Sequence, residues 1–270
     1  MSCLVMGVVN VTPDSFSDGG LFLEADAAIA RGLALRAQGA DLLDIGGEST
    51  RPSAERVDPA VERERVLPVV RALAEAGAVV SIDTMNASTA LAAVAAGARI
   101  VNDVSGGLAD PEMLPAIAPT GADVVLQHWR GPSADMYAQA EYDDVVLEVQ
   151  RELSARIDAA AAAGIAPSRV IVDPGIGFGK VGSQNWAVLR GLPRIGGLGP
   201  RVMVGTSRKR FLADALGAAA SVERRDFATA VTSVLADQAG VWAVRVHDVA
   251  ATVDALRVAR SWEKGAGWTS

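Results

Sequence analysis

The chain has 270 residues, half of them apolar and only 4% aromatic, and its 25 basic and 32 acidic residues give a formal net charge of −7. An acidic chain of this kind is a poor candidate for binding nucleic acid or an anionic membrane surface. One cysteine and two histidines allow no internal disulfide and argue against a His/Cys zinc site. An anionic ligand would therefore need a local cluster of cations within a repelling field.

The amino-terminal segment does not resemble a secretory signal. It lacks a basic region, and its apolar run is interrupted by Asn10 and Pro13. No uncharged apolar stretch reaches the roughly 18 residues of a membrane-spanning helix. These features predict a cytoplasmic protein with no membrane partner.

Apolar runs rich in Val and Ile alternate with segments of helical periodicity along the whole chain. The predicted elements, in order, are strand Leu4–Val11, helix Asp26–Gln38, strand Asp41–Gly46, helix Pro59–Ala76, strand Val79–Thr84, helix Asn86–Ala96, strand Arg99–Val104, helix Pro111–Ala118, strand Asp123–His128, helix Val145–Ile157, strand Val170–Pro174, helix Gln184–Leu192, strand Val202–Gly205, helix Phe227–Ala239, strand Trp242–His247 and helix Val249–Trp262.

This alternation indicates a parallel sheet covered by helices. Eight strand–helix units in a chain of this length predict a single-domain (β/α)₈ TIM barrel over residues 1–264, with an open doubly wound sheet as the alternative. Residues 265–270 are expected to form a mobile tail.

Polar side chains follow every predicted strand, at the end where barrels build their active sites. They are Asn10, Glu48–Arg51, Asp83, Asn102–Asp103, Gln127–His128, Asp173, Ser207–Arg210 and Arg245–His247. Any one of these residues could serve only as a helix cap. Eight such ends at one rim predict a ligand site.

Four loops carry further signals. The segments Thr12–Gly20 and Glu48–Ser53 are long for a barrel and predict loops that cover a ligand, with flexible surface insertions as the alternative. Ser207 could cap a helix whose amides, beside three successive cations, attract a phosphate or carboxylate. The segment Asp173–Lys180 departs from the Walker pattern, so its glycines indicate close approach of the chain to a flat ligand.

Several of these segments resemble the signatures of bacterial dihydropteroate synthase. They are GVVNVTPDSFSDGG at 7–20, DIGGESTRP at 44–52, SIDT at 81–84, NDVSGG at 102–107, DPGIGFGK at 173–180, SRK at 207–209 and RVH at 245–247. The resemblance runs in order over nearly the whole chain. It implies a (β/α)₈ barrel, a homodimer, and the joining of 6-hydroxymethyl-7,8-dihydropterin diphosphate to 4-aminobenzoate with the help of Mg²⁺.

The resemblance also implies a role for each matching residue. The pterin would lie among Asp83, Asn102, Asp173 and Lys209. The diphosphate and Mg²⁺ would lie among Asn10, Thr50, Arg51, Arg245 and His247, with Asn10 as the metal ligand. The aminobenzoate would be bordered by Phe16, Pro52, Phe178 and Ser207. Asp18 and Arg51 would close over the reacting centre, so the residues expected to act in catalysis are Asp18, Arg51, Lys209, Arg245 and His247.

One position departs from this pattern. The family commonly has Met before the histidine that ends the fifth strand, and this chain has Gln127. A buried amide at that position must find a hydrogen-bond partner. His128 itself could be either a structural donor or a catalytic group.

The residue types suit displacement of a diphosphate. One carboxylate can accept two adjacent N–H groups of a pterin edge, and diphosphate departure needs cations rather than a proton donor. We expect an SN1-like step through a pterin cation stabilised by Asp18. The alternatives are a pterin-dependent methyltransferase, a pterin-binding paralogue without synthase activity, a glycosidase using Glu48 and Asp173, and a Schiff-base aldolase using Lys209.

Overall fold

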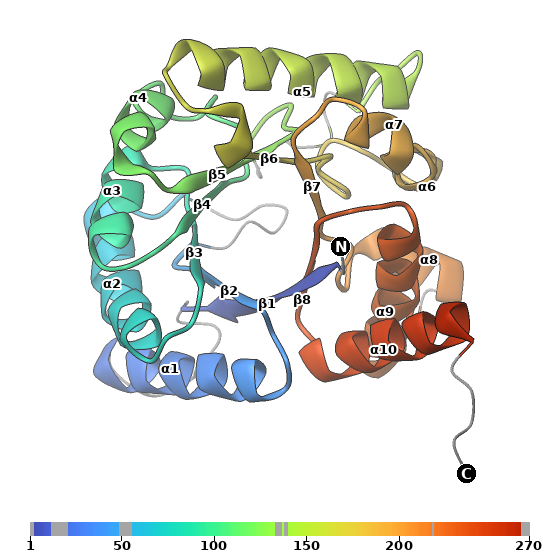
Figure 1. Cartoon of the computed structure of the whole chain (residues 1–270), viewed down its shortest axis with the longest axis horizontal. Coiled ribbons are helices and arrows are strands. Elements are labelled where there is room, and N and C mark those ends of the chain that lie inside the picture. Colours follow the sequence, from blue (N-terminus) through green and yellow to red (C-terminus); the bar gives the residue numbers. More distant parts are fainter. Residues whose placement is uncertain are drawn as a thin grey trace.

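Eight parallel strands close into a barrel in which each strand pairs with its neighbours along the chain and β1 pairs with β8 (Figure 1). The computed structural model describes residues 3–11, 21–48, 56–132, 137, 140–217 and 219–265. The strands are β1 (Leu4–Asn10), β2 (Leu42–Gly46), β3 (Val80–Asp83), β4 (Ile100–Asp103), β5 (Asp123–Gln127), β6 (Val170–Asp173), β7 (Arg201–Val204) and β8 (Ala243–Val246). The predicted TIM barrel is confirmed, and the closure of the sheet excludes an open doubly wound fold.

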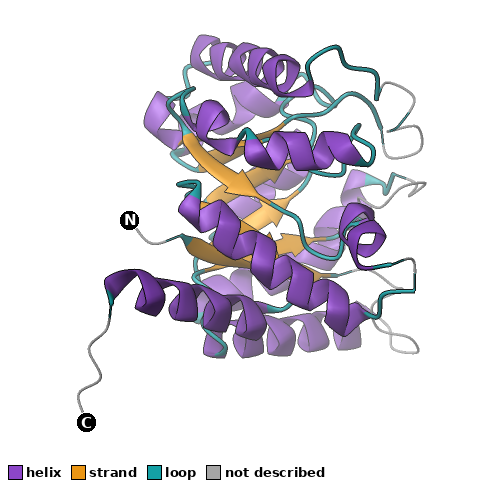
Figure 2. Cartoon of the chain, turned by 90° about the vertical axis from the view of Figure 1, so that its right-hand side faces the viewer, coloured by secondary structure: helices purple, strands orange, loops and turns teal. Residues whose placement is uncertain are grey.

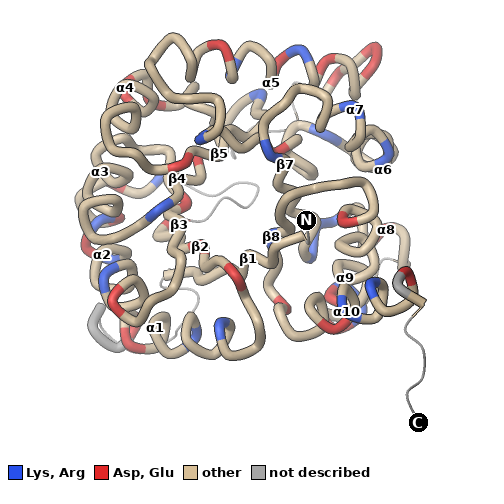
Figure 3. Tube along the Cα trace, in the orientation of Figure 1, with Lys and Arg blue, Asp and Glu red and all other residues tan. Residues whose placement is uncertain are grey.

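Helices pack around the outside of the strands (Figure 2). They are α1 (Leu21–Ala37), α2 (Pro59–Glu75), α3 (Ala87–Ala95), α4 (Met113–Ile117), α5 (Val145–Ala162), α6 (Ser183–Arg190), α7 (Leu192–Gly196), α8 (Arg210–Leu216), α9 (Val222–Gln238) and α10 (Val249–Lys264), with short 3₁₀ turns η2 (Ala118–Thr120) and η4 (Pro167–Arg169). Acidic and basic positions are interspersed around these helices (Figure 3). None of the described helices is long and apolar enough to cross a membrane.

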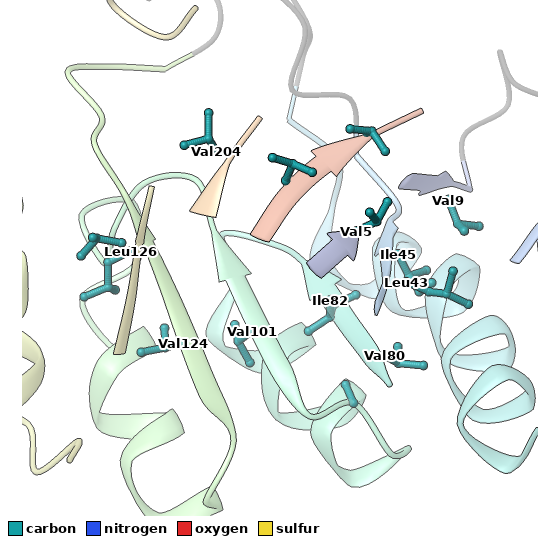
Figure 4. Close-up of a cluster of buried hydrophobic side chains, with 14 of the residues drawn as sticks. Val5, Val9, Leu43, Ile45, Val80, Ile82, Val101, Val124, Leu126 and Val204 are labelled. Carbon is teal, nitrogen blue, oxygen red and sulfur yellow. The ribbon is translucent and has the colours of Figure 1, made fainter. Parts of the chain in front are cut away.

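The alternation of side chains along each strand separates two apolar layers. One set of strand residues points outward and packs against the helices, as Figure 4 shows for Val5, Val9, Leu43, Ile45, Val80, Ile82, Val101, Val124, Leu126 and Val204. The intervening positions point into the barrel. Near the start of the strands they form a small apolar cluster of Met6, Leu42, Ile100, Val125, Ile171, Met203 and Ala243. Beyond that cluster the inward positions become polar, which prepares a site at the carboxyl ends.

Four of the described helices, α2, α5, α9 and α10, begin at a residue whose side chain caps them. Asp58 Oδ1 accepts a hydrogen bond from Ala60 N at 2.7 Å, and Asp144 Oδ1 accepts from Val146 N and Leu147 N, each at 3.0 Å. Ser221 caps α9, which therefore begins five residues before the predicted Phe227. The expectations for residues 266–270 lie outside the described residues.

The segment after β7 differs from the prediction. Ser207 does not cap a helix, because α8 begins only at Arg210 and its N-cap residue is Lys209, which makes no side-chain cap. Arg208 adopts a left-handed backbone with φ of 59°, and among the described residues it is the only non-glycine residue with positive φ. Its guanidinium forms two bonds to Asp226 on α9, at 2.7 and 2.8 Å. The three successive cations therefore do not form one patch.

Candidate active site

The polar inner surface at the carboxyl ends of the strands is built from six elements. Its members are Asp44 (β2), Asp83 (β3), Asn102 (β4), Gln127 (β5), Asp173 (β6) and Arg245 (β8). All except Arg245 are buried, and the Arg245 side chain is 22% exposed. Because a barrel brings the ends of its strands to one rim, residues up to 201 positions apart in sequence become direct neighbours here.

Arg245 bridges two carboxylates that lie on β2 and β3, two and three strands from β8 around the barrel. Its Nε lies 2.6 Å from Asp44 Oδ2, and its Nη2 lies 2.7 Å from Asp83 Oδ2. Asn102 Nδ2 donates to the same Asp44 oxygen at 3.0 Å. Burial raises the pKa of Asp83 to about 7, and the Arg245 guanidinium opposes that rise.

Three buried polar atoms in this region have no hydrogen-bond partner among the described residues. They are Asp44 Oδ1, Ser81 Oγ and Asn102 Oδ1. Buried polar atoms in native proteins are almost always hydrogen-bonded to protein or ordered water. Unpartnered acceptors beside a hydroxyl therefore indicate a place for a ligand that carries several N–H groups, or for water when no ligand is bound.

Asp173 and Lys209 form the next part of the site. Asp173 Oδ1 accepts from Gly175 N at 2.7 Å, and burial raises the pKa of this carboxyl while Lys209 opposes the rise. Lys209 Nζ donates to Ile176 O, and it lies 4.8 Å from the centroid of the Phe178 ring. Burial lowers the pKa of Lys209 to about 8, while Asp173 opposes the fall. A carboxylate and an ammonium that interact electrostatically thus lie side by side in this part of the site.

Ser207 and His247 form a pair at the β7 and β8 side of the rim. Ser207 Oγ lies 2.9 Å from His247 Nδ1 and accepts from His247 N at 3.1 Å. With its backbone N–H contact satisfied in this way, the hydroxyl can donate its proton to Nδ1. When the hydroxyl donates in this way, the imidazole proton lies on Nε2.

Two predictions about β5 are resolved by its surroundings. Gln127 is 5% exposed and donates from Nε2 to Val104 O at 3.3 Å, so the expected hydrogen-bond partner exists. His128 is 2% exposed and lies between Lys180 and Glu152 rather than at the rim. Burial lowers the pKa of His128 to about 4, which keeps the imidazole neutral. These contacts favour the structural alternative for His128.

The structure brings together most of the predicted site that it describes. Asp83, Asn102, Asp173, Lys209 and Arg245 share the inner surface, and Ser207 contacts His247. Asn10, at the end of β1, is partly exposed and makes no side-chain hydrogen bond to another described residue. The predicted residues Phe16, Asp18, Thr50, Arg51 and Pro52 lie outside the described residues.

Two residues of this region were missing from the sequence prediction. Asp44 is a carboxylate in the middle of the apolar strand Leu42–Gly46, and such a position requires a partner inside the barrel. Lys180 closes the glycine-rich segment and is 1% exposed. A charged residue within a buried strand was a usable signal for Asp44. The burial of Lys180 had no comparable signal, because the position follows a loop.

Comparison with known proteins identifies the family to which this barrel belongs. Residues 6–247 match the family described as pterin binding enzyme, and the chain belongs to that family. Several of the similar proteins are named dihydropteroate synthase. The protein of that name from Mycobacterium leprae is 53% identical over 263 residues, covering 96% of this chain and 93% of the relative.

Solved structures agree with this placement. The dihydropteroate synthase of Xanthomonas albilineans with 4-aminobenzoic acid superposes with a TM-score of 0.90 at 47% identity, covering 97% of this chain and 93% of the other. The same enzyme in complex with 7,8-dihydropteroate gives a TM-score of 0.86 at 44% identity, covering 97% and 94%. The resemblance inferred from the motifs is therefore confirmed, and this chain is a transferase of the dihydropteroate synthase group.

Proposed function

We propose that this chain joins 6-hydroxymethyl-7,8-dihydropterin diphosphate to 4-aminobenzoate, giving 7,8-dihydropteroate and diphosphate. The observation that carries the proposal is the polar inner surface, where buried acceptors without partners lie beside a carboxylate, an amide and two cations. The relatives crystallised with 4-aminobenzoic acid and with 7,8-dihydropteroate support the choice of both substrates.

The pterin would bind by its hydrogen-bonding edge. Asp173 Oδ1 accepts from Gly175 N and keeps a second lone pair, so both carboxylate oxygens can still accept from N–H groups of the ligand. Asn102 Oδ1 is a second acceptor without a partner, and Lys209 Nζ is a donor for a ring oxygen or nitrogen. Bonds that involve ionised groups are the stronger ones, so the Asp173 carboxylate should dominate this recognition.

The diphosphate would leave toward the cations of the rim. Arg245 retains its charge because burial is outweighed by Asp44 and Asp83, which raise its pKa. His247 would present an Nε2–H donor, since Nδ1 faces the Ser207 hydroxyl. Preorganised donors of this kind stabilise charge that develops on a leaving oxygen. The roles predicted for Asp18, Thr50 and Arg51 stay predictions.

Magnesium is part of the proposal. Mg²⁺ takes oxygen ligands and keeps several waters, so it needs few protein ligands. The partly exposed Asn10 carboxamide at the rim, which makes no hydrogen bond to another described residue, fits a single oxygen ligand of that kind. When bound, the ion would add positive charge beside the leaving diphosphate.

The proposed reaction is tested by turnover with both substrates and Mg²⁺. The wild-type chain is expected to release dihydropteroate and diphosphate in equal amounts. Binding of the pterin without product formation would favour the paralogue that lacks synthase activity. Methyl transfer without any use of 4-aminobenzoate would favour the methyltransferase.

The bond to the diphosphate is expected to break before the amine attacks. The bridging C–O bond would cleave with both electrons passing to oxygen, and the electron-rich dihydropterin would carry the resulting positive charge. The 4-aminobenzoate nitrogen would then form the new bond and lose its proton to water. With substrate labelled by ¹⁸O at the bridging position, we expect label to move into non-bridging positions without 4-aminobenzoate. Retention of all label, together with inversion at a chirally labelled methylene, would contradict the SN1-like step.

A homodimer is also part of the proposal, and the surface of α9 and α10 supports it. Phe227, Val231 and Leu235 follow one face of α9 at intervals of four, and Val258 and Trp262 do the same on the adjacent α10. Phe227 is 67% exposed and Trp262 is 87% exposed. Exposed apolar stripes that include aromatic residues are typical of subunit interfaces, and a two-fold axis would pair this surface with its copy.

Replacing Leu235 by Glu is expected to convert the dimer to a monomer, because a charge would be buried in the apolar interface. Leu147→Glu provides the matched control, since Leu147 is similarly exposed on α5, away from this surface. Sedimentation velocity measures both. A monomeric wild type, or a dimer that tolerates Leu235→Glu, would contradict the proposed interface.

The cytoplasm is the proposed location. The single cysteine, Cys3, is buried, and burial raises the pKa of its thiol to about 12, so it is an inert thiol that needs no oxidising compartment. The acidic composition gives no support for a nucleic-acid partner.

A further inference from the structure

Lys180 is a fully enclosed lysine behind the pocket. Its side chain is 1% exposed, and its ammonium donates to Gly175 O and Phe178 O, each at 3.0 Å. The third contact is with His128 Nδ1, at 2.9 Å. An ammonium has three donors and no acceptor, so the three contacts match its capacity. Burying a lysine is costly unless its donors are satisfied, which indicates that this position serves a purpose.

The loop that Lys180 holds has an unusual backbone. Gly175, Gly177 and Gly179 all have positive φ, at 65°, 81° and 57°, and only glycine adopts such values readily. At Gly175 a Cβ atom would lie 2.3 Å from His128 O, so the loop passes directly against the end of β5. The alternating backbone turns the Gly175 and Phe178 carbonyl groups toward the lysine.

The Lys180 ammonium is also contacted by residues outside the loop. His128 Nδ1 accepts from the ammonium, which leaves the imidazole proton on Nε2, and Nε2 lies 2.9 Å from Glu152 Oε2 on α5. Arg130 contacts the same carboxylate, at 2.5 Å from Oε1. Burial lowers the pKa of Lys180 to about 7 while Asp173 opposes the fall. A series of close polar contacts thus runs from the loop to α5, in which His128 Nε2 and Glu152 approach closely without the geometry of a hydrogen bond.

The same loop determines the geometry of the two main pterin groups of the site. Gly175 N donates to Asp173 Oδ1, and Ile176 O accepts from Lys209 Nζ. Both loop atoms lie within the segment whose carbonyl groups Lys180 holds. A loop that relaxed after loss of the ammonium would therefore change the positions of a carboxylate and an ammonium in the pocket at the same time.

We infer that Lys180 is a positioning residue for the pterin end of the pocket, which acts through the loop 174–180 on Asp173 and Lys209. It reaches the ligand only through these groups, because its three donors are occupied by Gly175, Phe178 and His128. The inference rests on the proposed function for the identity of the ligand, and on the contacts alone for the loop.

The test compares Lys180→Met, which keeps the length of the side chain and removes its donors, with the control Arg151→Met on the exposed face of α5. Hydrogen exchange of the amides of residues 175–180 is measured without ligand, and binding of 6-hydroxymethyl-7,8-dihydropterin by calorimetry. Misplacement of binding groups by about 1 Å can cost up to about 100-fold, and we expect at least about a tenfold loss of pterin affinity with faster exchange in the loop. KM for the dihydropterin diphosphate should rise more than KM for 4-aminobenzoate.

If Lys180→Met does not fold, Lys180→Gln replaces it, since the amide keeps two of the three donors and should give a smaller loss in the same direction. Pterin affinity and loop exchange equal to those of Arg151→Met would overturn the inference. Neither measurement requires turnover, so a wild type that binds the pterin but forms no dihydropteroate would contradict the proposed reaction and leave this test intact.

Discussion

Replacing Asp173 by Asn is expected to lower kcat/KM for the dihydropterin diphosphate by about 10²–10⁴. The physical reason is the loss of charge-assisted hydrogen bonds, each worth about 1.5–3 kcal/mol, from two adjacent N–H groups of the pterin to an ionised carboxylate. The carboxamide introduced by the substitution would also point its own N–H group at the N–H groups of the pterin edge, where two donors cannot form a hydrogen bond. Lys209 would in addition lose the opposite charge that opposes the fall of its pKa.

Steady-state kinetics with both substrates measures this effect, with Asp158→Asn on the exposed side of α5 as the matched control. Calorimetry with the unreacted pterin separates binding from chemistry. A kcat/KM of Asp173→Asn within about threefold of the wild type would contradict the assignment of Asp173 to the pterin edge, since a threefold change is only about 0.7 kcal/mol.

Replacing Arg245 by Met is expected to destabilise the fold as well as to abolish turnover. The guanidinium compensates Asp44 and Asp83, which are 0% and 6% exposed, and removing one partner of a buried ion pair typically costs about 3–5 kcal/mol. The leaving diphosphate would also lose a cation.

The loss of stability in Arg245→Met should depend on pH in a defined direction. Burial raises the pKa of Asp83 above the ordinary value of 3.8, and the Arg245 guanidinium opposes that rise. The pKa of Asp83 should therefore rise further when Arg245 is replaced by Met. A carboxyl whose folded-state pKa is raised favours folding when it is protonated, and it loses that contribution as the pH rises through the folded-state pKa. The deficit in the free energy of unfolding should therefore be smaller at pH 5 than at pH 8.

Urea unfolding at the two pH values measures this deficit. The triple variant Arg245→Met/Asp44→Asn/Asp83→Asn serves as the control, because it removes the uncompensated charges and should recover most of the stability at pH 8. A deficit that is the same at pH 5 and pH 8 would show that the carboxylates are not the source of the instability.

The barrel could be predicted because its signals are local. Runs such as Val79–Thr84 and Val170–Pro174 are short, continuous and apolar, and they recur between helical segments. The helix after Ser207 was predicted too early, because the Ser207 hydroxyl bonds His247 from the neighbouring strand. A cap prediction uses sequence neighbours, and it has no access to a partner 40 positions away.

The site could be predicted as a set of residues but not as a set of contacts. Asp83, Asn102, Asp173 and Arg245 follow from their places at strand ends and from the motifs that contain them. That Arg245 contacts Asp44 and Asp83 depends on the register and closure of the barrel, which bring the inward side chains of β8, β2 and β3 together. The role of Lys180 depends on the direction of carbonyl groups in a loop with positive φ, and residue types alone do not specify that direction.

The ion pair between Arg208 and Asp226 connects the segment that carries Lys209 with the proposed dimer surface on α9. The buried Asp226 carboxylate binds the guanidinium of Arg208, the residue with the left-handed backbone that directly precedes Lys209. The next residue along α9, Phe227, is exposed on the surface proposed to contact the second copy. A shift of α9 near Asp226 on association would reach Lys209 through this pair. If two copies associate through this surface and α9 shifts, the specific activity of a dilute sample would differ from that of a concentrated one.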